Sequence, residues 1–240
     1  MKIALSQPVL SVRGLSKTFT LHTQGGTKIE TFSGLDLEVR KGECLVLHGP
    51  SGAGKSTLMR LLYANYKPCA GSILVQHGDS WVDMATASPR AVLAVRHSTI
   101  GYVSQFLRVI PRISSLDIVA ERLTSHGEDA SGAREKAKAL LERLRIPRSL
   151  WDLAPATFSG GEQQRVNLAR GFIRHYPIML LDEPTASLDA ANRKTVVELM
   201  REAKAAGTAI VGIFHDEAVR EAVADRVYGL RPPETAPDAA

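Results

Sequence analysis

A glycine-rich stretch at positions 49–57, GPSGAGKST, constrains the fold of this 240-residue chain more than any other feature. It fits the pattern G-x-x-x-x-G-K-[ST]. An apolar run with strand character precedes it (residues 43–48), and a helix-forming run follows it (residues 57–63). Glycines let the backbone curl with its N–H groups inward, and a helix N-terminus favours an anion. A chance match in a glycine-rich turn is the alternative, but the strand and helix around the loop favour a nucleoside triphosphate site.

The residues of this loop have distinct expected roles. Lys55 is expected to reach the β- and γ-phosphates, and the Ser56 hydroxyl is expected to hold Mg²⁺. The positions predicted to contact the nucleotide are Gly49, Pro50, Ser51, Gly52, Ala53, Gly54, Lys55, Ser56 and Thr57.

Two carboxylates follow a second apolar run, residues 178–181. Asp182 and Glu183 therefore emerge at the carboxyl end of a buried strand, where open α/β sheets bind ligands. Asp182 is suited to hold Mg²⁺, and Glu183 to polarise and orient an attacking water. Helix capping or a surface ion pair is the alternative for such a pair, and the apolar run before it argues against that.

Composition narrows the class of protein. Hydrophobic residues make up 44% and charged residues 23%, as in soluble globular proteins. No apolar run approaches the ~20 residues of a membrane span, and the N-terminus resembles no secretory leader, so we expect a cytoplasmic chain. The net charge of +5 comes without a basic, aromatic-rich run, so no nucleic-acid partner is expected. The two cysteines, Cys44 and Cys69, are expected to be reduced.

Hydrophobic periodicity predicts one α/β domain over residues 1–231. Short strands at 9–12, 17–22 and 35–39 predict an antiparallel β subdomain. Buried strands alternating with helices predict a mostly parallel sheet covered on both faces. A polar loop is expected at 77–88, a helical subdomain is expected to be inserted at about 106–175, and the tail, 232–240, is expected to be disordered.

Two single residues leave alternatives open. Phe19 is suited to stack on an adenine ring, and a plain core phenylalanine is an equal alternative. His215 stands after the apolar strand 209–214, 32 residues beyond Glu183. A core histidine is the commoner outcome for such a position, and the context favours a sensor of the γ-phosphate.

Further motifs resemble those of the ATP-binding-cassette (ABC) ATPases. Residues 158–165, FSGGEQQR, resemble the family's signature, Gln105 its glutamine loop, residues 186–189 (ASLD) its D-loop, and His215 its switch histidine. They occur in the family's order and span nearly the whole chain. Phe158 and Glu162 replace the Leu and Gln of many members, and the signature serine and glycines are retained.

The resemblance implies ATP and Mg²⁺ as cofactors and an ABC-type P-loop core. It assigns catalysis to Glu183, His215, Gln105 and Lys55, and the metal to Ser56, Gln105 and Asp182. It also implies a head-to-tail homodimer, or a heterodimer with another ABC ATPase. In that dimer the signature, whose helix Ser159 caps, completes the partner's phosphate site. The remaining nucleotide contacts implied are Ser159, Gly160, Gly161, Glu162 and Asp189.

Three stretches, 102–112, 150–158 and 214–217, look like the L-protein family of the bacterial carbon–phosphorus lyase system. That resemblance implies a role with the other subunits of a phosphonate-processing complex. The complex makes ribose 1-phosphonate 5-triphosphate from ATP and an alkylphosphonate. No residues here provide for the ribose step.

Two other functions are alternatives. The first is the nucleotide-binding subunit of a membrane transporter of the lipoprotein-release or macrolide-exporter type. A cassette acting on ribosomes or DNA fits less well, because this chain has one cassette and a short insert. In any of these, Arg108 and Arg112, which flank apolar Val109 and Ile110, are candidate docking residues, and a solvent-facing loop is an equal alternative.

Overall fold

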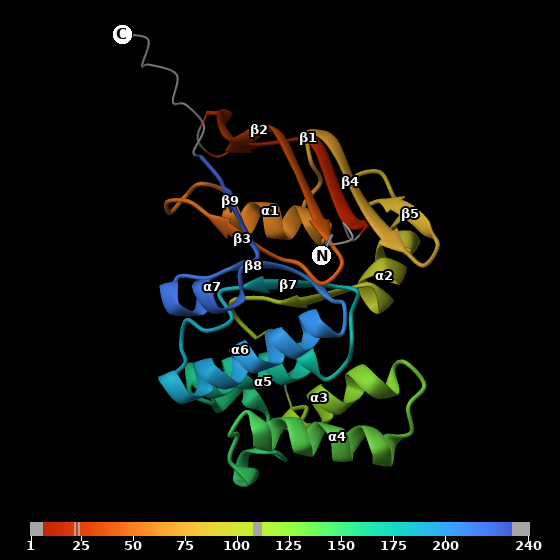
Figure 1. The fold of residues 1–240 in the computed structure, drawn as a ribbon, viewed down its shortest axis with the longest axis vertical. Helices are drawn as coiled ribbons and strands as arrows, with labels where there is room; N and C mark the ends of the chain where they lie inside the picture. The colour runs from red at the N-terminus through yellow and green to blue at the C-terminus, as the bar shows by residue number, and fades with distance from the viewer. Residues whose placement is uncertain (1–6, 22, 24, 108–111, 232–240) are drawn as a thin grey trace, which may run out of the picture.

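The computed structural model describes residues 7–21, 23, 25–107 and 112–231, and contains two sheets with helices between and below them (Figure 1). An antiparallel sheet lies at one end, followed by α1 (Lys55–Leu62) and then a parallel sheet. Helices α5 (Gly160–Phe172) and α6 (Ala190–Ala205) cover the other face of the parallel sheet. The expected α/β core with an antiparallel β subdomain is confirmed.

The antiparallel sheet has the order β2-β1-β4-β5. Its strands are β1 (Pro8–Leu21), β2 (Thr27–Arg40), β4 (Ala70–His77) and β5 (Ser80–Asp83). The sequence predicted three short strands where β1 and β2 form one long hairpin. Gly14 and Gly34 do not end strands: they adopt φ of 56° and 63° at irregularities of the β1–β2 register, which absorb extra residues without breaking the ladder. The predicted polar loop at 77–88 also contains the unforeseen strand β5.

The parallel sheet has the order β6-β7-β8-β3-β9, and each of its neighbouring pairs is parallel. Its strands are β3 (Cys44–His48), β6 (Ile100–Val103), β7 (Ile178–Asp182), β8 (Ala209–Ile213) and β9 (Arg226–Gly229). Along β3, Cys44 and Val46 pack into the core on the side of α5 and α6, while Leu45 and Leu47 pack into the core that contains α1. Both faces are therefore buried, which explains the near-continuous apolar strands.

The helical insert packs against this sheet. Helices α3 (Ser115–Thr124) and α4 (Ala130–Arg143) share one hydrophobic core with α5 and α6. Ser114 and Asp129 cap them by accepting from backbone N–H groups of the first turn. The other elements are α2 (Pro89–Ser98), α7 (Glu217–Val223) and short 3₁₀ turns at Arg148–Leu150 and Pro155–Thr157.

Some predictions fall outside the described residues. Arg108, Val109 and Ile110 of the candidate docking loop are among them, as is the tail 232–240. Arg112 is described, with φ of 70°. The division into one domain of residues 1–231 with an insert at 106–175 stays a prediction.

Gly54, the residue before α1, offers a test of the loop's geometry. Its φ is 87°, and a Cβ there would lie 2.5 Å from Thr31 Cγ2 and 3.1 Å from Phe32 Cδ1. We expect Gly54→Ala to destabilise the fold by at least about 2 kcal/mol, through backbone strain and this clash. Thermal unfolding measures the loss.

Gly229→Ala is the matched control, because its φ is not in the left-handed region and a Cβ there meets nothing within 4 Å. Equal melting temperatures for the Gly54→Ala variant and the parent would contradict the expected strain.

Candidate active site

The loop between β3 and α1 has the backbone of an anion-binding nest. Gly52 and Gly54 adopt φ of 81° and 87°. Gly54 is also the N-cap of α1, and it offers no side chain to the free N–H groups of the first turn. These donors and the helix dipole suit a phosphate group, so the loop fits the triphosphate that its sequence pattern predicts.

Lys55 holds the loop together. Its ammonium donates to the carbonyl oxygens of Gly49 at 2.7 Å and Pro50 at 2.8 Å. An ammonium carries three donors, so two stay within the loop and one is left for a ligand. The predicted contact of Lys55 with the phosphates stays a prediction.

The carboxylate of Asp182 lies beside this loop. It is 3% exposed, and it accepts from Ser56 Oγ at 3.4 Å and from the Tyr102 hydroxyl at 3.3 Å. Burial raises the pKa of the Asp182 carboxyl, and the neighbouring Glu183 charge raises it further. A hard divalent cation prefers such an oxygen pair and would neutralise a carboxylate that burial penalises, so Ser56 and Asp182 fit Mg²⁺.

Glu183 lies at the mouth of the site in an uncommon backbone conformation. Its φ is 52°, a left-handed value that a non-glycine residue adopts at some cost. Gln105 Nε2 donates to Glu183 Oε2 at 3.1 Å, and His215 Nε2 lies 2.7 Å from Oε1. The Glu183 side chain is 18% exposed, so it can still reach a water molecule. Gln105, Glu183 and His215 follow the carboxyl ends of β6, β7 and β8, so these strands bring them together. The Glu183 carboxylate, held by the other two side chains, is suited to orient a nucleophilic water.

A cleft of about 330 Å³ connects these groups. Phe19 lines it opposite the loop, partly buried, with its ring edge-on to Tyr66 at 5.4 Å and Lys17 Nζ 4.7 Å from its centroid. Phe19 therefore faces the cleft instead of the core, as adenine stacking requires. The lining residues are Phe19, Thr31, Ser51, Gly52, Gly54, Lys55, Ser56, Thr57, Glu183 and His215. Ala53 is fully buried beneath the loop.

The signature residues are not among those that line this cleft. Ser159 and Glu162 form a reciprocal capping box at the start of α5, and hydrogen bonds from Ser159 lower the pKa of the Glu162 carboxyl. Ser159 and Gly160 are exposed. A Cβ at Gly161 would lie 2.9 Å from the Ser187 carbonyl oxygen, so close packing is a second reason for glycine there.

Asp189 has a local structural role in addition to its predicted contact with a nucleotide. It caps α6 by accepting from the Asn192 backbone N–H at 2.7 Å, and this hydrogen bond lowers the pKa of the Asp189 carboxyl. Its predicted contact with a nucleotide stays a prediction.

Two residues of the site were missed from the sequence. Tyr102 bonds Asp182 from the neighbouring strand, and Thr31 packs against Gly54 from β2. Tyr102 lies three residues before Gln105 on a predicted strand, which was a usable signal. Nothing local marks Thr31.

The raised pKa of Asp182 makes a prediction for Asp182→Asn. Because the folded pKa exceeds the unfolded value of about 3.9, the ionised carboxylate costs folding free energy above the folded pKa. We expect the amide variant to melt at a higher temperature than the parent at pH 7, because the amide has no charge for burial to penalise. The difference should shrink as the pH falls toward 4, and Mg²⁺-dependent hydrolysis should be lost.

Thermal scans at the two pH values check this, with Asp152→Asn on the exposed surface as the control. A variant that melts lower than the parent at pH 7 would contradict the assigned desolvation.

Comparisons with known proteins agree with this geometry. A profile of the family described as "ABC transporter" matches residues 32–186, more than half of the chain. The lipoprotein-releasing system ATP-binding protein LolD of Shewanella sp. (strain MR-7) is 37% identical over 209 residues, 87% of each chain. LolD 2 of Caulobacter vibrioides is 36% identical over 228 residues, 95% of this chain and 96% of that one.

Solved structures give the same result. The ATP-binding cassette MJ0796, in a dimeric post-hydrolysis state bound to ADP and Pi, superposes with a TM-score of 0.83 at 25% identity. It covers 92% of this chain and 94% of that one. These findings do not support the resemblance to the phosphonate L-protein family, since the relatives named here are lipoprotein-releasing ATPases. The order of motifs, the fold and the matched profile lead to one conclusion: the chain belongs to the ABC transporter family of ATP-binding proteins.

Proposed function

We propose that this protein hydrolyses ATP and uses the cycle to drive a partner chain. The observation that carries the proposal is the placement of Glu183, held between Gln105 and His215 at the mouth of the phosphate-loop cleft. Glu183 orients and polarises the attacking water. His215 and Gln105 position the Glu183 carboxylate relative to the γ-phosphate. Lys55 binds the phosphates. Mg²⁺, held by Ser56, Asp182 and Gln105, supplies charge neutralisation when bound.

The active form is proposed to be a head-to-tail dimer. Ser159, Gly160, Gly161 and Glu162 are absent from the lining of the cleft, so one chain presents half of a composite phosphate site. The exposed N-terminus of α5 is free to face a second protomer. Among solved cassettes of this fold, MJ0796 has been found as a dimer. Either a second copy or another ABC ATPase can fill the role.

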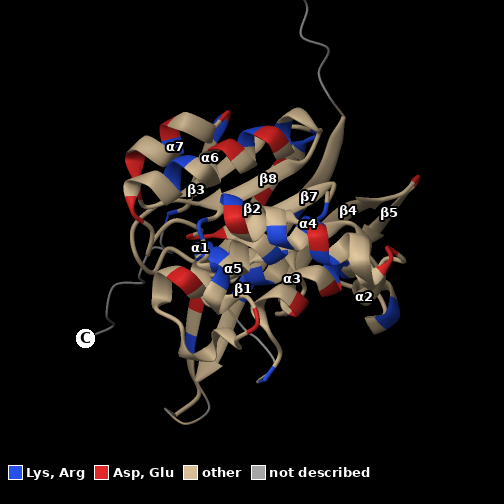
Figure 2. Ribbon diagram, turned by 90° about the horizontal axis from the view of Figure 1, so that it is seen from below, with Lys and Arg blue, Asp and Glu red and all other residues tan. Residues whose placement is uncertain are grey.

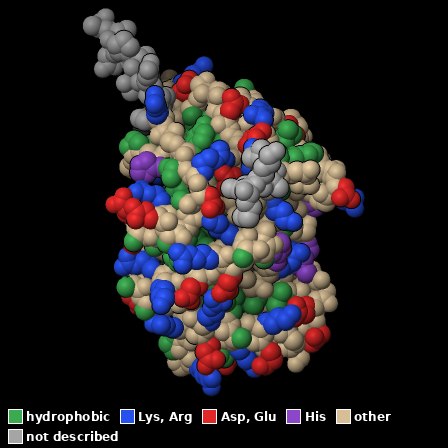
Figure 3. Space-filling model, viewed as in Figure 1, with side chains coloured by type: hydrophobic (Ala, Val, Ile, Leu, Met, Phe, Trp, Pro, Cys, Tyr) green, Lys and Arg blue, Asp and Glu red, His purple; other side chains and the backbone are tan. Residues whose placement is uncertain are grey.

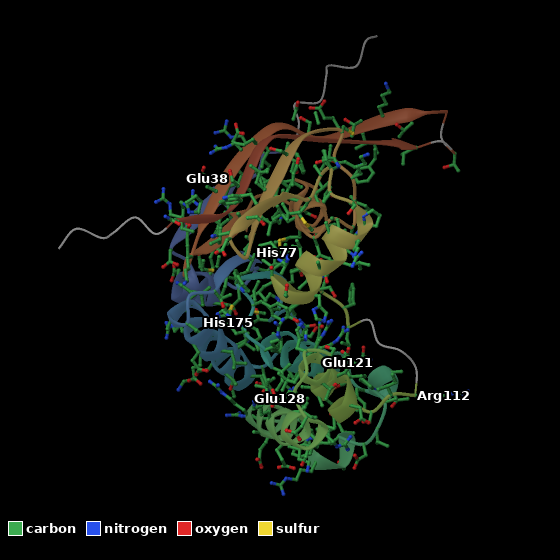
Figure 4. All side chains as sticks on the ribbon, turned by 90° about the vertical axis from the view of Figure 1, so that its right-hand side faces the viewer. Glu38, His77, Arg112, Glu121, Glu128 and His175 are labelled. Atoms are coloured by element: carbon green, nitrogen blue, oxygen red, sulfur yellow. The ribbon has the colours of Figure 1, made fainter. Side chains whose placement is uncertain are left out.

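The first candidate partner is a membrane subunit of a lipoprotein-release type of transporter. The relatives that bear the name LolD support it. Among the described residues no helix is long and apolar enough to cross a bilayer, so the membrane chain would be separate. Phe106 is 74% exposed and follows Gln105, which bonds Glu183, so it offers a docking contact close to the catalytic carboxylate. Arg112, at the edge of the molecule in Figure 4, is a second candidate docking residue. On the face drawn in Figure 3, acidic and basic side chains intermingle, as a protein interface allows.

The second candidate is the phosphonate-processing complex. The stretches 102–112 and 150–158 suggest it, and each carries a large exposed apolar side chain, Phe106 at 74% and Leu153 at 51%. Trp151, in contrast, is buried and donates to the Ile146 carbonyl oxygen, so it anchors the insert. The comparisons favour the transporter, and this second role rests on sequence resemblance.

One experiment separates the two. A tagged Glu183→Gln variant is purified with ATP and Mg²⁺ from phosphate-starved cells, and mass spectrometry identifies what accompanies it in soluble and membrane fractions. The same pull-down with ADP is the control. Recovery of a polytopic membrane protein with ATP supports the transporter, and recovery of phosphonate-processing enzymes supports the second candidate. Recovery of neither with ATP would overturn the proposed coupling to a partner.

A further inference from the structure

A narrow cavity lies at the edge of the parallel sheet formed by β6, and its lining includes residues of α2, β6, α3 and α5. Figure 2 shows basic positions, in blue, on and around α5. The free volume of the cavity is about 10 Å³, room for one oxygen-sized group. Three guanidinium groups and three phenol rings line it: Arg96, Arg122, Arg170, Tyr63, Tyr102 and Tyr176. Figure 4 places Glu121, the residue before Arg122 on α3, on this flank of the molecule.

Glu121 is the carboxylate that acts on both Arg122 and Arg170, so within the described part of the chain these two positive charges share a single countercharge. Among the residues the structure describes, the Arg170 guanidinium has no hydrogen bond or ion pair with protein, and the Arg122 guanidinium has one distant ion pair, 4.0 Å to Glu121. Burial lowers the pKa of Arg170, and the charge of Arg122 lowers it further. Desolvated like charges cost free energy unless an anion joins them.

Nearby arginines differ in this respect. Arg96 donates to the Tyr63 carbonyl oxygen and to Asn65 Oδ1, and its guanidinium lies 4.5 Å from the Tyr63 ring centroid. Arg174 donates to the His97 carbonyl oxygen and lies over the Tyr176 ring. Protein oxygens accept hydrogen bonds from the guanidinium groups of both Arg96 and Arg174. Within the described residues, the guanidinium groups of Arg122 and Arg170 have no such hydrogen bond.

The cavity is close to the active site. The ring of Tyr63 lies 5.0 Å from that of Tyr102, whose hydroxyl donates to Asp182 Oδ2. Asn167, also on the lining, donates to the Ser104 carbonyl oxygen just before Gln105. A group bound in the cavity would therefore contact residues that touch the Mg²⁺ carboxylate and the glutamine loop.

We propose that this cavity is an oxyanion site, in which Arg122 and Arg170 bind an oxygen of a phosphate or carboxylate group. A planar fork of N–H donors matches either group, and neutralising two partly buried positive charges supplies the driving force. The oxyanion is either a free inorganic ion or an acidic side chain on a partner chain, and the two sources are distinguished by experiment.

The first arm uses inorganic phosphate as the probe. The full-length protein is saturated with ADP, so that the phosphate loop is filled, and its melting temperature is followed with phosphate at constant ionic strength. At a phosphate concentration a hundred times the dissociation constant, a rise of about 5 °C or more is expected. Arg170→Met and Arg122→Gln should lose the rise, while Arg143→Gln, whose guanidinium pairs with Glu202 elsewhere, should keep it.

Two readouts keep these variants interpretable. Without phosphate, Arg170→Met should melt no lower than the parent, because a partly buried charge without a hydrogen-bond partner is removed. ADP affinity should be unchanged, which separates this site from the phosphate loop. If Arg170→Met fails to fold, Arg170→Lys, which retains the charge without the fork, should keep a weakened response.

The second arm uses the partner recovered with Glu183→Gln. If phosphate has no effect on the parent, a partner's carboxylate is the ligand. Adding Arg170→Glu should then reduce that recovery at least tenfold, while adding Arg143→Glu should not. No phosphate response and no loss of the partner with Arg170→Glu would overturn the proposal.

Discussion

Replacing Glu183 with glutamine is expected to lower the rate of ATP hydrolysis by about 10²–10⁴-fold, the contribution typical of a positioned general base. The amide keeps the shape of the side chain and cannot accept the proton of the attacking water. Nucleotide binding should survive, because Glu183 is not part of the phosphate loop. We expect ATP to accumulate in the closed dimer, which size-exclusion chromatography with ATP and Mg²⁺ should detect as a shift from monomer to dimer.

The Glu183→Gln variant should also leave the stability of the fold unchanged. Gln has the same size and the same backbone preferences as Glu, so the strain at φ of 52° should not change and Glu183→Gln should melt close to the parent. Glu217→Gln, which alters an exposed carboxylate paired with Arg220 on α7, is the matched control and should turn over normally. Normal turnover by Glu183→Gln would show that another group orients the water, and a variant that stays monomeric with ATP would argue against the dimer.

Removing the Lys55 ammonium is expected to weaken ATP binding by roughly 10- to 150-fold. This range corresponds to the ~1.5–3 kcal/mol of a hydrogen bond to a charged group. Lys55→Ala also removes the two bonds that tie the ammonium to the Gly49 and Pro50 carbonyl oxygens. Gly49 is partly buried and Pro50 is exposed, so water can replace these hydrogen bonds and the expected loss of fold stability is small. Titration with a fluorescent ATP analogue measures the affinity.

Lys136→Ala is the control for Lys55→Ala. Lys136 pairs with Glu128 on the helical insert and is well exposed, so its removal should leave nucleotide affinity unchanged. Unaltered affinity in Lys55→Ala would mean that the ammonium serves the loop and not the ligand. Together with Glu183→Gln, this variant separates binding from hydrolysis.

The local parts of the site were predictable because each lies in one short stretch. The glycines before Lys55, the apolar run before Asp182, and the capping box of Ser159 and Glu162 are patterns whose physics acts within a few residues. Strand β5 and the long β1–β2 hairpin were missed. Short polar strands carry little periodicity, and glycines that mark a bulge resemble glycines that mark a turn.

The assembled site depends on contacts between distant segments. Ser56 meets Asp182 across 126 positions, and Gln105 meets Glu183 across 78. Both contacts require β6, β7, β8 and β3 to lie in that order, with their carboxyl ends at one edge of the sheet. Residue types and spacing along the chain identified the ABC ATPase family and predicted which residues form its site, while the finer resemblance to the phosphonate L-protein family was not supported. The tertiary structure decided that Tyr102 bonds Asp182, that Phe19 lines the cleft, and that Arg96, Arg122 and Arg170 share a cavity. Strand order and packing act between segments that no local pattern connects.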